Sequence, residues 1–407
     1  MTDNLPLRPI YPDEWPGFWR TIVRTFHADV HDDESEIERK PFEPERSLAV
    51  FDGDAVVATT GIFTRDLSVP GAVLPAAHVT MVSVLATHRR RGLLNRMMRQ
   101  QLADVRQDGR EPVAVLWASE EAIYGRYGYG VASYQFRISA DTREVRLPAG
   151  RAPGRLRLAE PTEVVEDLSR VYERVRPHRP GFPSRQQPWW EVRLADIERN
   201  RDGATERRCV LYENAGGVAG YALWRTKQQW DGTGPIGEVI VEELCCDDPE
   251  GRIELWRFLF DIDLTRRISA WNLPTDEPLV QNVDAPRRLS RSYGNALYAR
   301  VVDVASALAG RRYPTPVDLV LEITDDLLPE NSGRWRLTGD LEKASCERTS
   351  DRADLTLGIA ELGAVYLGGT PLGALAAAGL VKGRPEAIAA GNAAFGWHVA
   401  PYAPEVF

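Results

Sequence analysis

The chain has 407 residues, a length that predicts two or three domains rather than a single core. Hydrophobic residues make up 43% and charged residues 27%, as in globular proteins, and no apolar run is long enough to span a membrane. The net charge of −9 argues against nucleic acid as a partner, because phosphates bind basic surfaces. An acidic protein suits a cationic partner such as an amine. With no signal-peptide pattern, no CxxC pair and no histidine cluster, we expect a cytoplasmic protein without disulfides or a metal site.

The first third of the chain has the pattern of a mixed α/β domain. Two strand-like runs, Ser47–Phe51 and Ala55–Phe63, flank an Asp-Gly-Asp turn and predict a hairpin. A further strand is expected over Ala77–Leu85. Apolar residues then recur at helical spacing, which predicts a helix over Arg91–Gln107, and Val113–Ala118 follows as a buried strand.

The same order of elements returns after a linker rich in proline and glycine at 147–155. Strands over Arg208–Tyr212, Gly217–Trp224 and Gly237–Leu244 and a helix over Ile253–Ile262 match the hairpin, strand and helix of the first segment. A single repeat of roughly 160 residues indicates a duplication rather than a solenoid. We therefore expect two domains of one fold, over residues 1–148 and 149–287.

Residues 288–407 predict a third domain, of the α+β class, because strand-like runs come before helical ones. The expected strands are Ala299–Val304, Val317–Ile323, Trp335–Thr338 and Asp354–Ile359, and the expected helices are Ala360–Leu367, Leu372–Ala378 and Pro385–Gly391. The last eight residues contain two prolines and several apolar side chains, unlike an ordinary frayed terminus.

A strand-to-helix junction at Val84–Leu94 carries the clearest chemical signal. The first turn of a helix offers free backbone N–H groups and a favourable dipole, which suits a pyrophosphate. Gly92 permits close backbone approach, and neighbouring arginines add charge-assisted hydrogen bonds. Arg89, Gly92 and Leu94 fall on the R/Q-x-x-G-x-G/A positions of the GNAT superfamily of N-acetyltransferases, which the junction resembles, although Leu94 replaces the usual small residue.

A second motif follows the next buried strand, at residues 119–129. It resembles the GNAT segment Y-x-x-x-G-F/Y, with Tyr124 at its start and Gly128-Tyr129 at its end. The resemblance implies that Tyr124 protonates the departing CoA thiolate. A phenol with a pKa of about 10 is a reasonable acid for a thiolate whose conjugate acid has a pKa of about 8.5. Tyr127 and Tyr129 are expected in the core.

The whole chain resembles the Eis (enhanced intracellular survival) family: two tandem GNAT-like domains, the second degenerate, then a domain similar to a sterol carrier protein. That resemblance implies an acetyl-CoA co-substrate, a homohexamer, and a catalytic base provided by the free C-terminal carboxylate, on Phe407. It places acetyl-CoA against Ser83, Val84, Leu85, Arg89, Arg91, Gly92, Leu93, Leu94, Asn95, Arg96, Ser119 and Glu120.

A base is needed because an alkyl ammonium has a pKa of about 10.4 and must lose a proton before it can attack. Many GNAT enzymes use a glutamate on the strand before the phosphate turn, but residues 81–85 contain none. Burial would raise the pKa of the Phe407 carboxylate from about 3.5 toward a useful range. Glu120 and Glu121 are the internal alternatives.

The second repeat lacks the phosphate motif. Its corresponding turn, Cys246–Arg252, carries three carboxylates that would repel CoA, and Pro249 removes one N–H donor. We expect this domain to be a scaffold without a cofactor.

Three functions are compatible with the sequence. The first is transfer of an acetyl group to a primary amine of a cationic small molecule, aminoglycoside- or polyamine-like, or to lysine. The second is a lipid- or small-ligand-binding protein, centred on the apolar segment Leu355–Leu380. The third is an interaction protein with a decayed acetyltransferase site. If Trp189 and Trp190 are exposed rather than in the core, they are candidates for subunit contacts.

Overall fold

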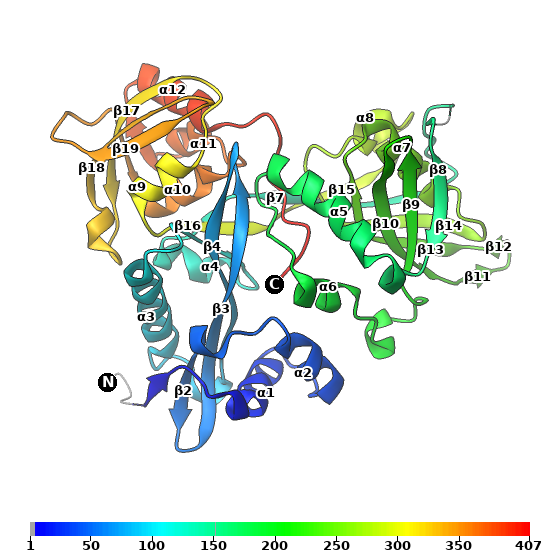
Figure 1. Cartoon of the computed structure of the whole chain (residues 1–407), viewed down its shortest axis with the longest axis horizontal. Coiled ribbons are helices and arrows are strands. Elements are labelled where there is room, and N and C mark those ends of the chain that lie inside the picture. Colours follow the sequence, from blue (N-terminus) through cyan, green and yellow to red (C-terminus); the bar gives the residue numbers. More distant parts are fainter. Residues whose placement is uncertain (1–4, 151) are drawn as a thin grey trace.

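The computed structural model describes residues 5–150 and 152–407, which form three domains in chain order (Figure 1). Two seven-stranded sheets and one five-stranded sheet lie at their centres. The prediction of two similar α/β domains followed by an α+β domain is confirmed. Among the described residues, no helix has the length and apolar character needed to cross a membrane.

The first domain is built on a sheet of order β1-β2-β3-β4-β5-β16-β6. Its strands are β1 (Leu7–Arg8), β2 (Leu48–Asp52), β3 (Ala55–Val69), β4 (Ala72–Val84), β5 (Val113–Trp117), β6 (Gly130–Val131) and β16 (Leu297–Val301). Its helices are α1 (Trp15–Thr25), α2 (Asp32–Arg39), α3 (Leu93–Asp108) and α4 (Glu121–Tyr124). The predicted helix and strands are present, with β3 and β4 longer than expected. Helix α3 buries Met97, Met98 and Leu102, the residues whose spacing predicted it.

The second domain has a sheet of order β15-β7-β14-β13-β10-β9-β8. Its strands are β7 (Tyr134–Asp141), β8 (Arg155–Ala159), β9 (Arg208–Asn214), β10 (Gly217–Lys227), β13 (Gly237–Cys246), β14 (Thr265–Leu273) and β15 (Ser290–Asn295), with β11 (Trp230–Asp231) and β12 (Gly234–Pro235) forming a small ribbon. Its helices are α5 (Val165–Val175), α6 (Gln187–Leu194), α7 (Pro249–Phe260) and α8 (Leu279–Asn282). The four cysteines of the chain are free thiols.

The strands do not divide at residues 148 and 287, where we expected the domain boundaries. β7 precedes residue 148 yet pairs with β14 and β15 of the second sheet, and β16 follows residue 287 yet lies between β5 and β6 of the first. Alternating apolar residues identify a strand but not the sheet that it joins. The two domains are therefore joined by an exchange of strands, which fixes their relative position.

The third domain packs directly on the first. Its sheet has the order β19-β18-β17-β20-β21. The elements are α9 (Val304–Gly310), β17 (Val317–Thr324), β18 (Gly333–Gly339), β19 (Ala344–Arg348), β20 (Leu355–Gly358), α10 (Ile359–Tyr366), α11 (Leu372–Ala377), β21 (Val381–Gly383) and α12 (Pro385–Phe395). A Cβ on Gly363 of α10 would lie 2.2 Å from the carbonyl oxygen of Ala299 in β16, so only glycine permits this contact. Arg300 and Asp325 form a buried ion pair across the same boundary at 2.7 Å.

The apolar segment Leu355–Leu380 is largely used in this packing. Leu362, Val365 and Leu372 lie in one core with β16 of the first domain. Residues of this segment line neither the cleft between the first two domains nor the smaller cavity beside α1 and α2.

The chain ends between the first two domains. After α12 it runs out of the third domain and stops at the position marked C in Figure 1. Backbone and side-chain hydrogen bonds hold this tail: Tyr402 N–H donates to Pro180 O at 2.8 Å, and Asn272 Nδ2 donates to Ala403 O at 3.0 Å. The tail is thus an ordered element without helix or strand.

Candidate active site

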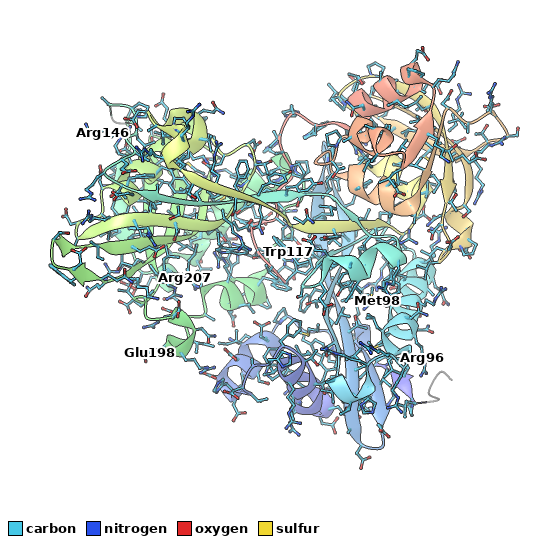
Figure 2. The ribbon with its side chains drawn as sticks, turned by 180° about the vertical axis from the view of Figure 1, so that it is seen from behind. Arg96, Met98, Trp117, Arg146, Glu198 and Arg207 are labelled. Carbon is cyan, nitrogen blue, oxygen red and sulfur yellow. The ribbon has the colours of Figure 1, made fainter. Side chains whose placement is uncertain are left out.

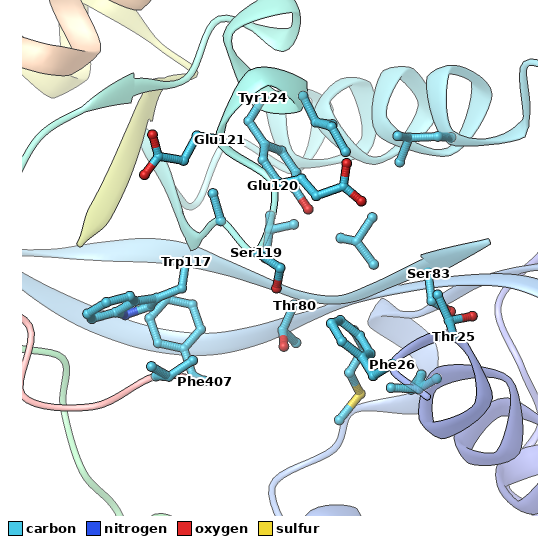
Figure 3. A pocket seen from close by; sticks show the side chains of 18 of the residues that line it. Thr25, Phe26, Thr80, Ser83, Trp117, Ser119, Glu120, Glu121, Tyr124 and Phe407 are labelled. Atoms are coloured by element: carbon cyan, nitrogen blue, oxygen red, sulfur yellow. The ribbon is translucent and has the colours of Figure 1, made fainter. Parts of the chain in front are cut away.

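A cleft of about 1470 Å³ opens between the first and second domains. Its walls come from α1, α2, β4, the start of α3, the segment 117–127, β15 and the last two residues of the chain. Figure 3 shows Ser119, Glu120 and Tyr124 on one side of the strands and Phe407 arriving on the tail. Both predicted catalytic residues and much of the predicted cofactor site therefore lie in this cleft.

A β-bulge shapes the floor of the cleft. Thr59 pairs with Ser83 and Gly61 with Thr80, so two residues of β4 stand opposite one residue of β3. Met81 in the bulge has φ 54°, unusual for a residue with a side chain. Parallel pairing of β4 with β5 covers only Ala76 to His78. Beyond His78, β4 presents backbone groups to the cleft instead of to β5, which suits an extended ligand that pairs like a strand.

The first turn of α3 faces the same cleft. Gly92 precedes the helix with φ 80°, and no side chain caps the N–H groups of that turn. Arg89, Arg90 and Asn95 also line the cleft here. Uncapped amides at the positive end of a helix, with arginines beside them, have the donors and the charge that suit an anion.

The corresponding helix of the second domain is capped by its own side chain. The Asp248 carboxylate accepts hydrogen bonds from Glu250 N–H at 2.9 Å and Gly251 N–H at 3.0 Å at the start of α7. The acidic turn expected to repel phosphate therefore also occupies the donors that a phosphate would need.

Tyr124 lies at the end of α4 with 8% of its surface exposed, and it lines the cleft. Burial, with smaller contributions from Tyr127 and Glu120, raises the pKa of Tyr124 to about 12. The hydroxyl therefore stays protonated at neutral pH, the form required of a proton donor. Tyr127 and Tyr129 are buried in the core around Tyr124, as predicted.

Phe407 packs against His78 of β4, with ring centroids 4.7 Å apart in an edge-to-face arrangement. Burial and the nearby Arg65 keep the pKa of His78 well below its usual value, so this imidazole is neutral. Phe407 also borders the cleft together with Val406. The terminal residue is thus held by an aromatic contact at the point where β4 leaves β5.

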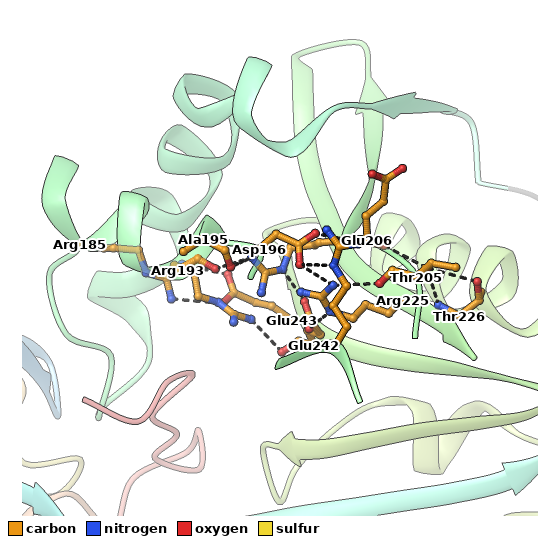
Figure 4. Close-up of polar contacts among 12 residues, drawn as sticks. Arg185, Arg193, Ala195, Asp196, Thr205, Glu206, Arg225, Thr226, Glu242 and Glu243 are labelled. Atoms are coloured by element: carbon orange, nitrogen blue, oxygen red, sulfur yellow. Dashed lines mark hydrogen bonds and ion pairs between the residues drawn. The ribbon is translucent and has the colours of Figure 1, made fainter. Parts of the chain in front are cut away.

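Glu405 fixes the tail two residues before its end. Its carboxylate accepts a hydrogen bond from Arg65 of β3 at 2.5 Å and pairs with Arg185 of the second domain at 2.7 Å. Arg185 also pairs with Glu243. The Glu243 carboxylate in turn pairs with Arg193 at 2.8 Å (Figure 4). Burial opposes ionisation, but Arg185 and Arg65 hold the pKa of Glu405 below its usual range.

Most of the predicted cofactor residues line the cleft. They are Ser83, Val84, Arg89, Gly92, Leu93, Leu94, Asn95, Ser119 and Glu120. Ser83 contributes its strand rather than its hydroxyl, which is buried against Thr59 Oγ1 at 2.6 Å. Leu85, Arg91 and Arg96 are not among the lining residues. The Arg96 guanidinium instead donates to Leu5 O at 2.5 Å on the side of α3 toward the N-terminal strand (Figure 2), because its helical position points it that way.

Sequence reasoning missed the wall formed by α1 and α2. Trp19, Phe26 and Glu38 line the cleft from these helices. The spacing of Trp15, Phe18 and Ile22, all buried on one face of α1, is the helical signal that would have found this wall.

Trp189 and Trp190 are buried and are therefore not available for subunit contacts. Trp189 packs edge-to-face on Phe63 at 4.6 Å, and Trp190 lies against Tyr172. They belong to the interface between the first two domains, beside the arginines that hold the tail.

Comparison with known proteins bears out this architecture. Profiles described as acetyltransferase (GNAT) domains match residues 6–132 and 181–301, and a sterol carrier protein domain profile matches residues 304–404. N-acetyltransferase Eis of Mycobacterium tuberculosis is 32% identical over 391 residues, which cover 92% of each chain. The chain belongs to the Eis family of GNAT N-acetyltransferases.

Two further similar proteins agree with this assignment. An uncharacterized N-acetyltransferase of Streptomyces avermitilis is 45% identical over 406 residues, covering 98% of this chain and 99% of its own. The crystal structure of Eis1 from Mycobacterium abscessus has a TM-score of 0.85 at 29% identity and covers 99% of this chain and 100% of its own. The protein is an enzyme of the acyltransferase class.

Proposed function

We propose that this Eis-family enzyme transfers an acetyl group from acetyl-CoA to a primary amine of a cationic small molecule, aminoglycoside- or polyamine-like, or of a lysine side chain. The observation that carries the proposal is the meeting of three features in one cleft: the uncapped start of α3, the Tyr124 hydroxyl and the chain terminus at Phe407. The first binds an anion, the second donates a proton and the third accepts one.

The residues present fit acetyl-CoA. The first turn of α3 and the nearby Arg89 and Arg90 suit its pyrophosphate, and the free edge of β4 beyond the bulge suits its pantetheine amides. The cleft volume exceeds the roughly 300–1,000 Å³ of ordinary ligand pockets, which leaves space for an acceptor as well. When bound there, acetyl-CoA supplies the thioester whose acetyl group is transferred.

Two residues of the chain move the protons. The Phe407 carboxylate accepts a proton from the acceptor ammonium, and the freed nitrogen attacks the thioester carbonyl. As the carbon–sulfur bond breaks, the Tyr124 hydroxyl donates its proton to the sulfur. The attacking nitrogen loses its second proton to become the neutral amide, and this proton restores the Tyr124 hydroxyl. Holding Phe407 by Glu405 and His78 keeps the base in place without further reorganisation. Glu120 and Glu121 line the cleft and remain the internal alternatives for the base.

We also propose a homohexamer in a reducing compartment such as the cytoplasm. The hexamer follows from the Eis resemblance, and exposed aromatic residues such as Trp230 and Tyr293 support subunit contact. The free cysteines, three of them buried, suit a reducing environment. Light scattering at micromolar concentration tests the assembly, and a monomer would contradict it.

The test of function is release of CoA thiol from acetyl-CoA across a panel of primary amines and lysine peptides. We expect amine-dependent thiol release by the wild-type chain and loss of most of it in Tyr124→Phe. Acetyl-CoA that binds without turnover on any amine would support the alternative of a decayed site. A lipid retained through purification, with no CoA binding, would support the lipid-binding alternative.

A further inference from the structure

Glu38 of α2 is a carboxylate that the fold does not use. The acidic residues near the start of α2 are paired with the second domain: Asp33 with Arg199 at 2.6 Å, and Glu34 with Asn200 Nδ2 at 2.6 Å. Among the described residues, no cation or hydrogen-bond donor pairs with the Glu38 carboxylate. The contacts of α2 therefore give the charge of Glu38 no structural role.

Glu38 lies in the wall between two cavities. It lines the active-site cleft and also a second cavity of about 500 Å³ at the junction of α1, α2 and the second domain. Trp19, Phe26 and Val192 border both cavities with it. Burial, with the nearby Glu34 carboxylate, raises the pKa of Glu38 to about 7. Burial therefore disfavours the ionised form of Glu38 in the free protein.

The other charges around the second cavity are balanced. Arg225 donates to Glu242 at 2.6 Å and to Asp196 at 2.7 Å, and Arg207 pairs with Glu242 at 2.5 Å (Figure 4 shows Arg225 with its two partners). These arginines are therefore occupied by carboxylates and do not repel a cation as free charges would. An ammonium group that entered this region would gain Glu38 as its counter-ion.

The walls beside Glu38 suit an alkylammonium group. Trp19 and Phe26 provide aromatic surface, which attracts cations and packs against methylene groups. A carboxylate flanked by aromatic rings is the chemistry by which proteins recognise a desolvated ammonium.

We infer that Glu38 is a subsite for a second ammonium group of the acceptor, a group that does not itself react. This inference rests on the proposed acetyltransferase function, and it narrows the acceptor to amines with at least two cationic groups. The reacting amine lies near Phe407 and Tyr124, and the other ammonium group lies against Glu38. A monoamine of the same length leaves Glu38 without a counter-ion.

The experiment compares Glu38→Gln with Glu36→Gln, an exposed residue of the same helix, as the matched control. Acceptors are α,ω-diaminoalkanes of increasing length, each paired with the n-alkylamine of equal length. In the wild type and the control we expect a higher kcat/KM for the diamine at the lengths that reach Glu38. In Glu38→Gln this preference falls on the order of tenfold, the size of one charge-assisted interaction. An unchanged preference, or an equal loss for both amines, overturns the subsite.

Two measurements keep this result separate from the proposed function and from misfolding. Calorimetric titration of the same diamines into both variants requires no turnover: equal affinity of wild type and Glu38→Gln overturns the subsite even if amines are acetylated. A wild-type chain that binds diamines through Glu38 but acetylates no amine would refute only the proposed function. Because an unpaired desolvated carboxylate is costly, Glu38→Gln should also raise the thermal midpoint, whereas a carboxylate with a structural role would lower it on substitution.

Discussion

Glu405 and Arg185 lie 2.7 Å apart where the tail of the third domain meets the second domain. The other oxygen of the same carboxylate accepts a hydrogen bond from Arg65 of the first domain at 2.5 Å. One buried side chain thus connects all three domains, two residues before the chain ends in the cleft. The position of the Phe407 carboxylate depends on this contact, so the docking of the domains and the proposed proton acceptor are linked.

Replacing Glu405 with Gln should therefore impair catalysis more than cofactor binding. The amide cannot neutralise the two buried guanidinium groups, and breaking a buried pair costs about 3 kcal/mol of stability or more. We expect a lower thermal midpoint and at least a tenfold loss of kcat, with acetyl-CoA affinity retained because the start of α3 is untouched. Glu386→Gln, on an exposed position of α12, is the control. Full turnover by Glu405→Gln would contradict this role of the tail contact.

The same pair predicts a dependence of stability on pH. Arg185 and Arg65 hold the pKa of Glu405 low despite its burial, so the folded pKa lies below the unfolded one. A depressed pKa contributes stability that is fully present above the unfolded pKa of about 4.5 and is lost as the pH falls through the folded pKa. The difference in unfolding free energy between wild type and Glu405→Gln should be constant near neutral pH and shrink below about pH 4.5. Urea denaturation at a series of pH values measures it, and a difference that grows in acid would refute the assignment.

One acetyl-CoA should bind per chain, at α3. The first turn of α3 has no side-chain cap, whereas Asp248 occupies the equivalent donors of α7. Gly92→Val should weaken binding by about tenfold or more, because backbone approach to the pyrophosphate is blocked. Gly109→Val is the matched control, since Gly109 has a similar φ of 68° at the other end of α3 and its Cβ would meet no atom within 4 Å. Titration calorimetry that finds two equivalent sites, or equal weakening by both variants, would contradict this prediction.

Local sequence patterns correctly predicted the helices, strands and turns that depend on residues close together in the chain. The helical spacing of Leu93 to Val105, the glycine before it and the repeat of hairpin, strand and helix are all short-range signals, and the structure shows the corresponding elements. The acidic turn before α7 was recognised from its charges, and the structure adds that Asp248 caps the helix.

Features that depend on distant residues could not be predicted in this way. Glu405 contacts Arg65 across 340 positions of sequence, and nothing near either residue indicates the other. The exchange of β7 and β16 between sheets is likewise a matter of topology, not of alternation. Arg96 lay within the expected pyrophosphate run, but the rotation of each helical residue by about 100° points its side chain elsewhere.

Replacing Tyr124 with Phe tests the proton donor. The ring still packs in the core, so we expect an unchanged fold and acetyl-CoA affinity with kcat reduced by about a hundredfold. Since the pKa of Tyr124 is about 12, the wild-type kcat should show no loss from its ionisation up to about pH 10, where an unperturbed tyrosine would be half ionised. Steady-state assays of wild type and Tyr124→Phe over a range of pH measure the loss of kcat and its dependence on pH. A decline centred near pH 10 that disappears in Tyr124→Phe would show that burial does not raise this pKa.

The role of the terminal carboxylate is tested by extending the chain, which moves the carboxylate and keeps the Phe407 side chain. Adding one glycine after Phe407 displaces the carboxylate, and the phenyl ring can still pack against His78, so we expect normal acetyl-CoA binding and a loss of kcat of about a hundredfold. Phe407→Leu is the complementary control, because it keeps a free terminal carboxylate while removing the aromatic contact, and its loss should be smaller. Rapid-quench measurement of a single turnover compares the chemical step in the two variants. If the extended chain keeps full turnover, the carboxylate of Phe407 is not the base, and the role passes to Glu120 or Glu121, whose Gln variants would then show the loss instead.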